Sequence, residues 1–341
     1  MSFFTKHTTL YTALLVACIS CRDDSLRENT APEYEITTES HTAALSDRNY
    51  VDIIWVIDDS GSMAPYQEAV ADNFTTFIDN FAETQLDFRF SVISTSVDGG
   101  EAPDGRMNNT PSSLTSDALK RNPTTFSRNF RSSVQIGTTG SADEQAMWNI
   151  KRHFERHGPN SNDPYLREYA QTIVFYLSDE RDYSGNDPSA NEPKDPENPP
   201  PIDDTTGPAY LEHYKATLGT DNIKFFAILK EDLNDARWVA LTESTGGSIS
   251  SIDGDYSVTL NSLGSYVVQQ QSYNLIYLEK PAKSDGTMVV RVNGSEVPSE
   301  QWKFYWENQL IQIDEAAINE GDSVEVDFET QTNPNYIPSQ L

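Results

Sequence analysis

Three apolar runs limit the folds that are open to this chain. They are residues 50–57 (YVDIIWVI), 172–177 (TIVFYL) and 223–229 (IKFFAIL), which are rich in β-branched and aromatic side chains. Strands that helices cover on both faces have such near-continuous apolar sequences, whereas half-exposed strands alternate apolar and polar residues. Segments with the apolar spacing of a helix lie between the runs. This alternation predicts an α/β domain with an open, mostly parallel sheet flanked by helices.

Further periodic segments extend this prediction. Apolar and polar residues alternate over 86–94, which indicates a more exposed strand. Ser141 and Glu144 have the spacing of a capping box, so a helix is expected to begin at Ser141. The complete set of expected helices covers residues 66–81, 141–157, 208–218, 234–244 and 255–270.

The pattern changes near residue 273, where short alternating segments begin. Asn293-Gly294 lies between two of them and is a strong signal for a hairpin turn, so a small antiparallel β module is expected. The proline- and aspartate-rich stretch at 183–207 is expected to be an exposed loop. The predicted organisation is a signal peptide at 1–21, a flexible acidic tether at 22–47, an α/β domain at 48–272, an all-β domain at 273–332 and a tail at 333–341.

Net charge narrows the range of partners. The chain has 53 acidic and 24 basic residues, which gives a formal charge of −29. Nucleic acids need a basic surface and acidic membrane surfaces repel such a chain, so neither is expected as a direct partner. Carboxylates in excess favour hard divalent cations. The two cysteines are Cys18 and Cys21, so no disulfide is expected in the body of the protein.

The N-terminus has the pattern of an export signal. Lys6 precedes an apolar run at 10–17, which is too short for a membrane-spanning helix of ~20 residues. The sequence LVAC that ends at Cys18 resembles the lipobox of bacterial lipoproteins, which implies a lipid anchor on Cys18. Cys21 is the alternative anchor, and a soluble secreted protein is the other interpretation. Because Ile19 rather than aspartate follows Cys18, the resemblance implies the outer membrane of the cell envelope, with membrane contact through the anchor only.

Polar side chains follow two of the apolar runs. Asp58, Ser60 and Ser62 come directly after the first run, and Asp179 comes shortly after the second. Because the carboxyl ends of parallel strands meet at one edge of a sheet, these side chains are expected to lie close together. A cluster of carboxylate and hydroxyl oxygens suits Mg²⁺, with Mn²⁺ and Ca²⁺ as alternatives.

With the strand before it, this motif resembles a known family. The chain is similar to von Willebrand factor type A (vWA) domains over about residues 48–272, and Asp58, Ser60 and Ser62 match the family's metal-ion-dependent adhesion site (MIDAS). The resemblance implies a vWA fold, which is Rossmann-like, and a bound divalent cation.

The resemblance also implies two further ligands. Asp179 maps to the second aspartate of the family's site, and Ser141 maps to a hydroxyl ligand that precedes a helix. The family usually has threonine at that position, and Thr139 is the alternative if the loop is longer by two residues. Glu180 differs from the family pattern, because the family commonly has glycine at this position.

The function that the resemblance implies is binding and not catalysis. Hydroxyl ligands leave the ion electron-poor, so an acidic residue of a protein partner can fill its open position. The expected protein is an envelope-anchored adhesion protein, and no enzyme. A structural or assembly role with a non-essential metal site is the first alternative. A metal-dependent hydrolase with Asp179 or Glu180 as the base is the second.

Two histidines on the expected helix at 141–157 are four residues apart. His153 and His157 have the spacing of a zinc pair, but the sequence between them is Phe-Glu-Arg, so the His-Glu-x-x-His pattern of metalloproteases is absent. Basic neighbours indicate an exposed, solvated face instead.

Overall fold

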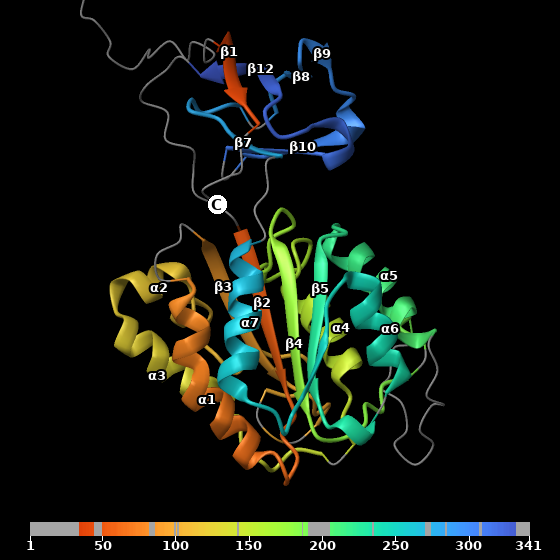
Figure 1. Cartoon of the computed structure of the whole chain (residues 1–341). Coiled ribbons are helices and arrows are strands. Elements are labelled where there is room, and N and C mark those ends of the chain that lie inside the picture. The colour runs from red at the N-terminus through yellow and green to blue at the C-terminus, as the bar shows by residue number, and fades with distance from the viewer. Residues whose placement is uncertain are drawn as a thin grey trace, which may run out of the picture.

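The computed structural model describes residues 34–43, 50–81, 86–98, 100, 102–141, 143–185, 187–189, 205–233, 235–269, 274–283, 285–306 and 309–331. The predicted signal peptide with Cys18 and Cys21, the tail at 333–341 and the middle of the loop at 183–207 lie outside the described residues. An α/β domain and a β domain make up the described chain (Figure 1).

The α/β domain is built on a five-stranded sheet. Its strands lie in the order β3 (Asp87–Ser94), β2 (Tyr50–Ile57), β4 (Gln171–Ser178), β5 (Ile223–Leu229) and β6 (Ile249–Ser251). Every neighbouring pair is parallel. The three apolar runs form β2, β4 and β5, the interior strands of the sheet, and helices flank them. The predicted α/β fold class is confirmed.

Helices cover both faces of this sheet (Figure 1). One face carries α1 (Ala64–Asp79), α2 (Ser116–Arg121), α3 (Pro123–Val134) and α7 (Tyr256–Gln269). The other face carries α4 (Ala146–His157), α5 (Thr206–Leu218) and α6 (Ala236–Thr245). Alternate residues of β2 enter different cores, because successive side chains of a strand point to opposite faces. Trp55 contacts Phe77 and Phe130, whereas Ile54 packs in the core beneath α4, α5 and α6.

Helix α4 begins at Ala146, so the predicted start at Ser141 is wrong. The hydroxyl of Ser141 accepts a hydrogen bond from the N–H of Asp143, and the side chain of Glu144 is fully buried. A capping box needs the glutamate side chain to reach back to the helix N-terminus. Because Glu144 turns into the interior instead, residues 143–145 precede the helix and are not part of it.

The β domain contains two antiparallel sheets. One has the order β1 (Tyr34–Thr42), β12 (Ser323–Gln331), β8 (Met288–Val292) and β9 (Ser295–Glu296), and the other has β10 (Trp302–Tyr305), β11 (Leu310–Ile313) and β7 (Leu275–Tyr277). Asn293 and Gly294 join β8 to β9 with φ of 51° and 78°, as a two-residue hairpin with positive φ at both positions requires. The predicted antiparallel β module is confirmed.

The first strand of the β domain comes from the N-terminal part of the chain. Residues Tyr34–Thr42 form β1, which pairs with β12 along its whole length. The tether predicted at 22–47 is therefore wrong over this strand, while 22–33 and 44–47 lie outside the described residues. The chain passes from the β domain to β2 and returns to the β domain at β7. The α/β domain is thus an insertion within the β domain.

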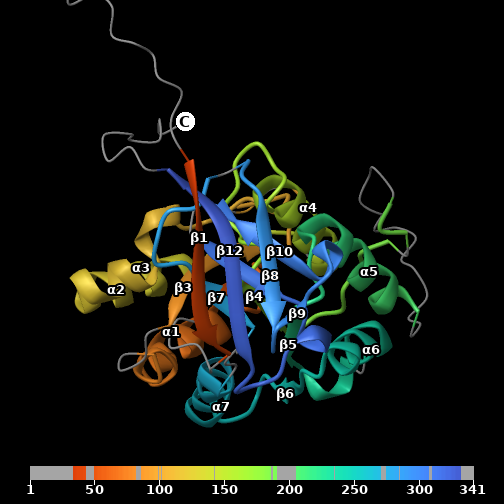
Figure 2. The same ribbon diagram turned by 90° about the horizontal axis from the view of Figure 1, so that it is seen from above.

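The β domain lies at the amino ends of the central strands (Figures 1 and 2). Tyr50, the first residue of β2, contacts Tyr277 of β7 with ring centroids 6.2 Å apart. Tyr169, just before β4, contacts Tyr305 of β10 at 4.7 Å. The carboxyl ends of the strands, where ligands bind in open α/β sheets, are therefore at the edge of the sheet away from the β domain.

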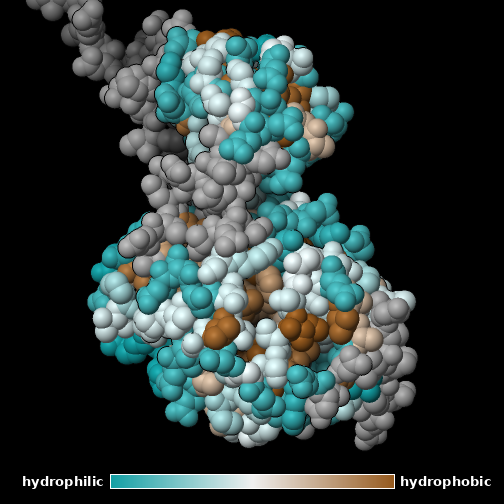
Figure 3. Space-filling model, viewed as in Figure 1, coloured by the Kyte–Doolittle hydropathy of each residue, from teal (hydrophilic) through white to brown (hydrophobic). Residues whose placement is uncertain are grey.

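The face of the molecule that carries α7 is mostly hydrophilic where it is described, with a few small patches of apolar residues (Figure 3). Among the large hydrophobic residues of the described part, the exposed ones are Ile36, Ile249 and Val258. No helix in the described ranges has the length and apolar content needed to cross a membrane.

Candidate metal centre

The chain turns sharply after β2 and gathers three side-chain oxygens. The N–H of Ser60 donates to Oδ1 of Asp58 at 2.7 Å, and the hydroxyls of Ser60 and Ser62 are 3.3 Å apart. Gln67, one turn into α1, donates from Nε2 to the carbonyl oxygen of Asp58 at 2.9 Å. Asp58 is fully buried and Ser62 is exposed, so this turn leads from the interior to the surface.

The end of β4 adds the second carboxylate. β4 is the direct neighbour of β2, and the N–H of Asp58 donates to the carbonyl oxygen of Leu177 at 3.0 Å. Oδ1 of Asp179 accepts a hydrogen bond from the hydroxyl of Ser62 at 2.9 Å. The hydroxyl of Ser178 donates to Oδ2 of Asp58 at 2.5 Å. The structure thus brings together the motif after β2 and Asp179, which are 117 residues apart at their contact.

The spacing of these oxygens fits a small divalent cation. Neighbouring oxygens of an octahedral Mg²⁺ site with bonds of about 2.1 Å lie about 3 Å apart. The distances of 3.3 Å from Ser60 to Ser62 and 2.9 Å from Ser62 to Asp179 are close to this value. Within the described residues, no group of three or more His, Cys, Asp or Glu side chains is arranged to hold a metal ion. The set above contains two carboxylates, and its other oxygens are hydroxyls.

Ser141 lies beside Asp59 and has other hydrogen-bond partners. Its N–H donates to the hydroxyl of Ser96 at 2.8 Å, and that hydroxyl donates to Oδ1 of Asp59 at 2.8 Å. Its own hydroxyl accepts from the N–H of Asp143 at 3.0 Å. Thr139, the alternative ligand, is exposed. The loop that carries both residues is thus tied to the site through Asp59.

Buried negative charge dominates the electrostatics of this site. Burial raises the pKa of Asp58, the charge of Asp179 adds to this, and the hydrogen bond from Ser178 opposes it. Burial also raises the pKa of Asp59 to about 6. The pKa of Glu180 is raised by burial and then by the charge of Asp58. A divalent cation would favour the ionised form of these carboxyl groups, so their environment fits a cation.

Three further residues of this region are not among the predicted ligands. Ser178 directly follows the apolar run at 173–177 within β4, which is the one hint that it points into a polar site. Glu144 is fully buried and its Oε2 accepts a hydrogen bond from Thr95. Asp182 accepts hydrogen bonds from the N–H of Met147 and from Nε1 of Trp238, so it holds the start of α4 against α6.

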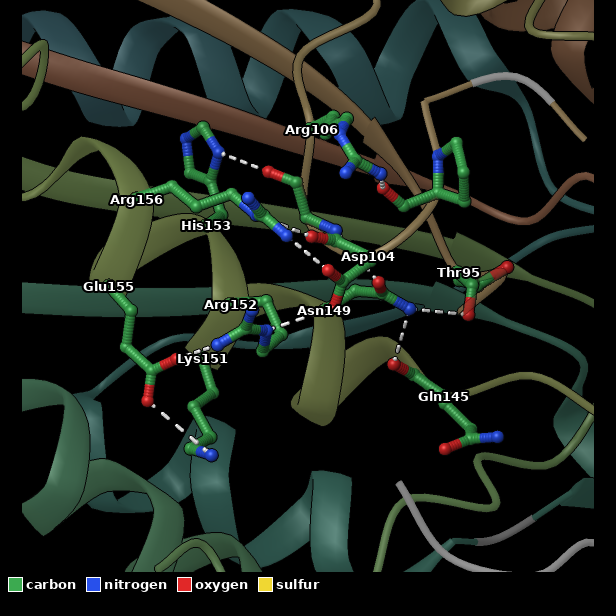
Figure 4. Close-up of polar contacts among 12 residues, drawn as sticks. Thr95, Asp104, Arg106, Gln145, Asn149, Lys151, Arg152, His153, Glu155 and Arg156 are labelled. Atoms are coloured by element: carbon green, nitrogen blue, oxygen red, sulfur yellow. Dashed lines mark hydrogen bonds and ion pairs between the residues drawn. The ribbon is translucent and has the colours of Figure 1, made fainter. Parts of the chain in front are cut away.

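His153 is fully buried, so the exposed face predicted for it is wrong. The reason is a loop that folds over α4. Asp104 of this loop forms ion pairs with Arg152 and Arg156, and Nδ1 of His153 is 3.0 Å from the carbonyl oxygen of Gly105 (Figure 4). Burial lowers the pKa of His153 to about 3, so the ring is neutral at physiological pH and serves as a packing group.

Comparisons with solved structures find distant matches. No protein-family model and no curated protein sequence matches the chain. The open conformation of the pilus adhesin SpaC from Lactobacillus rhamnosus GG matches with a TM-score of 0.43 and 13% identity, over 91% of this chain and 44% of that chain. A second crystal form of SpaC matches with a TM-score of 0.42 and 11% identity, over 88% and 42%. The chain spans less than half the length of SpaC, and similarity at this level does not assign it to a family.

Proposed function

We propose that this protein is an envelope-anchored binding protein of the adhesion type, with a vWA-like domain that engages a protein partner through a divalent cation. One observation carries the proposal. The hydroxyl of Ser62 lies 3.3 Å from the hydroxyl of Ser60 and 2.9 Å from Oδ1 of Asp179, at the carboxyl edge of a parallel sheet. The resemblance of the motif after β2 to a MIDAS supports it.

The residues proposed to hold the cation are Asp58, Ser60, Ser62 and Asp179, as the sequence predicts, with a fifth ligand from the loop that carries Ser141. When bound, the ion would supply a Lewis acid that accepts a carboxylate from a partner. Ser62 is exposed and Asp179 is half-buried, so the outer side of the site faces solvent. A partner can therefore approach without any rearrangement of the sheet. This geometry supports binding to a surface acidic residue.

Metal-dependent capture of a partner tests the proposal. The full-length protein is used as bait for envelope and secreted fractions, first with Mg²⁺ and then with EDTA. We expect a partner that is captured with Mg²⁺, released by EDTA and absent with Asp58→Asn bait. Capture that is insensitive to EDTA and to Asp58→Asn would contradict the proposal and favour the structural or assembly role.

The anchor is proposed from the sequence alone, since Cys18 lies outside the described residues. Lipidation of Cys18 should place the mature protein in the detergent phase on phase separation. Cys18→Ser is expected to move it to the aqueous phase or to leave it unprocessed. Cys21→Ser is the matched control and should behave like the wild type. The opposite result for the two variants would identify Cys21 as the anchor.

A further inference from the structure

The loop before α4 brings a buried carboxyl group across the centre of the candidate site. The N–H of Gln145 donates to the carbonyl oxygen of Thr95, just after β3, at 3.0 Å. On the other side, the N–H of Tyr183, beyond β4, donates to the carbonyl oxygen of Glu144 at 2.5 Å. In the sheet, β2 lies between β3 and β4. Glu144 therefore crosses the carboxyl end of β2, where Asp58 lies.

The side chain of Glu144 is fully buried and only half satisfied. Its Oε2 accepts from the hydroxyl of Thr95, and its Oε1 has no hydrogen-bond partner among the described residues. Burial raises the pKa of Glu144, and the charge of Asp58 raises it further. A buried polar atom without a partner costs about 1–3 kcal/mol, so such atoms in native proteins call for an explanation. A cation beside Asp58 would supply the missing partner.

The position of Glu144 is fixed by the first turn of α4. Nδ2 of Asn149 donates to the carbonyl oxygens of Thr95 and Gln145, at 2.6 Å and 2.9 Å (Figure 4). The N–H of Met147 donates to the buried carboxylate of Asp182 at 3.0 Å. These contacts hold the loop on both sides of the site. The backbone of Glu144 is thus held beside the site before any ion binds.

Ser141, by contrast, shapes the loop. Its hydroxyl accepts from the N–H of Asp143, and its N–H is bound to Ser96. Through Ser96 it supports the carboxylate of Asp59, which packs closely on Gly140. The hydroxyl of Ser141 is therefore engaged in the turn, whereas Oε1 of Glu144 is not engaged.

We propose that Glu144, and not Ser141, supplies the ligand of this loop to the divalent cation. Among the described residues the carboxylates are not yet grouped around an ion, so the side chain of Glu144 would turn until Oε1, which has no partner there, meets the cation. The inference rests on the proposed function, because it assumes that a cation occupies the site. A carboxylate binds a hard cation more strongly than a hydroxyl does. The ion is therefore expected to bind firmly in the absence of a partner.

Calorimetric titration of the full-length protein with Mn²⁺ alone tests this assignment. Glu144→Gln keeps the shape of the side chain and an acceptor for Thr95, and it removes the charge. We expect it to weaken Mn²⁺ binding at least about 10-fold. Ser141→Ala should change the affinity by less than about 3-fold, and so should Glu212→Gln, which alters an exposed glutamate of α5. Glu144→Asp, which keeps the charge on a shorter side chain, should lie between Glu144→Gln and the wild type.

The outcomes separate this inference from the proposed function. In EDTA, Glu144→Gln should melt close to the wild-type temperature, since glutamine keeps the size of the buried side chain and the acceptor for the hydroxyl of Thr95. Wild-type affinity in folded Glu144→Gln, together with weak binding in Ser141→Ala, would overturn the inference and leave the proposed function intact. A wild-type protein that does not bind Mn²⁺ would overturn both. If Glu144→Gln does not fold, equal affinity of Glu144→Asp and the wild type would overturn the inference.

Discussion

Saturating Mg²⁺ is expected to raise the melting temperature of the wild-type protein and to leave that of Asp58→Asn unchanged. An ion that binds the native state alone stabilises it by about 2.7 kcal/mol at a concentration of 100 times Kd. For a domain of this size, 1 kcal/mol corresponds to roughly 2–4 °C, so the wild-type shift should be roughly 5–10 °C. Asp58 is the buried carboxylate of the motif, and its loss should remove the shift entirely.

The substitution is chosen so that the metal-free fold survives. The amide of an asparagine at position 58 can still accept from the N–H of Ser60, and its NH₂ group can donate to the hydroxyl of Ser178. Asp72→Asn is the matched control, because Asp72 is an aspartate on the exposed surface of α1 and should leave the full Mg²⁺ shift. A normal Mg²⁺ shift in Asp58→Asn would contradict the assignment of the site. Differential scanning calorimetry in EDTA and in Mg²⁺ measures all three proteins.

The interior strands could be predicted from the sequence because their environment is uniform. A strand that is buried on both faces has to be apolar at nearly every position. The predicted run at 223–229 coincides with β5, and the run at 172–177 with all but the end residues of β4. Helix α3 has no such constraint. Its buried apolar side chains are Phe126, Phe130 and Val134, so few apolar residues mark it in the sequence.

Strand β1 could not be predicted because its apolar residue faces solvent and its polar residues face the core, the reverse of the usual alternation. Ile36 is 65% exposed, whereas Thr37 and Glu39 point into the β domain and are buried. Glu39 is satisfied there by the N–H groups of Glu279 and Lys280, at 2.8 Å and 2.9 Å. A polar residue is stable inside a protein when such donors exist, and these donors lie 240 and 241 residues further along the chain. Neither donor is near β1 in the sequence, so the local pattern of residues cannot indicate that Glu39 is buried.

The candidate site also has one part that could be predicted from the sequence and one part that could not. The topology of a parallel sheet brings the ends of adjacent strands together, so the approach of Ser62 to Asp179 follows from the strand pattern. The place of Glu144 follows instead from hydrogen bonds of its backbone and side chain to the ends of β3 and β4. A glutamate at that sequence position is equally compatible with a capping box. Burial decides between the two, and burial is a property of the tertiary structure.

The second large effect is expected at the opposite edge of the sheet. Arg167, in the loop before β4, is buried and donates to Oδ1 of Asp52 in β2 at 2.7 Å and to Oδ1 of Asp87 in β3 at 2.7 Å. Its guanidinium also lies 4.9 Å from the ring centre of Tyr50, which faces the β domain. Asp52 is fully buried and forms an ion pair with this arginine.

Arg167→Met is therefore expected to lower the free energy of unfolding by about 3–5 kcal/mol, because removal of one partner leaves a buried charge uncompensated. The melting temperature should fall by roughly 6–20 °C. Arg131→Met is the matched control. Arg131 pairs with Asp72 on the exposed surface, and its loss should cost no more than about 1 kcal/mol.

A double-substitution cycle separates the charge from the packing of Arg167. If the buried charge of Asp52 causes the loss, Asp52→Asn should restore part of the stability of Arg167→Met, because an amide does not carry the desolvation penalty of a carboxylate. Urea unfolding of the single and double variants measures this coupling. Equal losses for Arg167→Met with and without Asp52→Asn would contradict the electrostatic explanation. The stability of this edge would then come from the contact of Arg167 with Tyr50 and from the backbone carbonyls that the arginine binds.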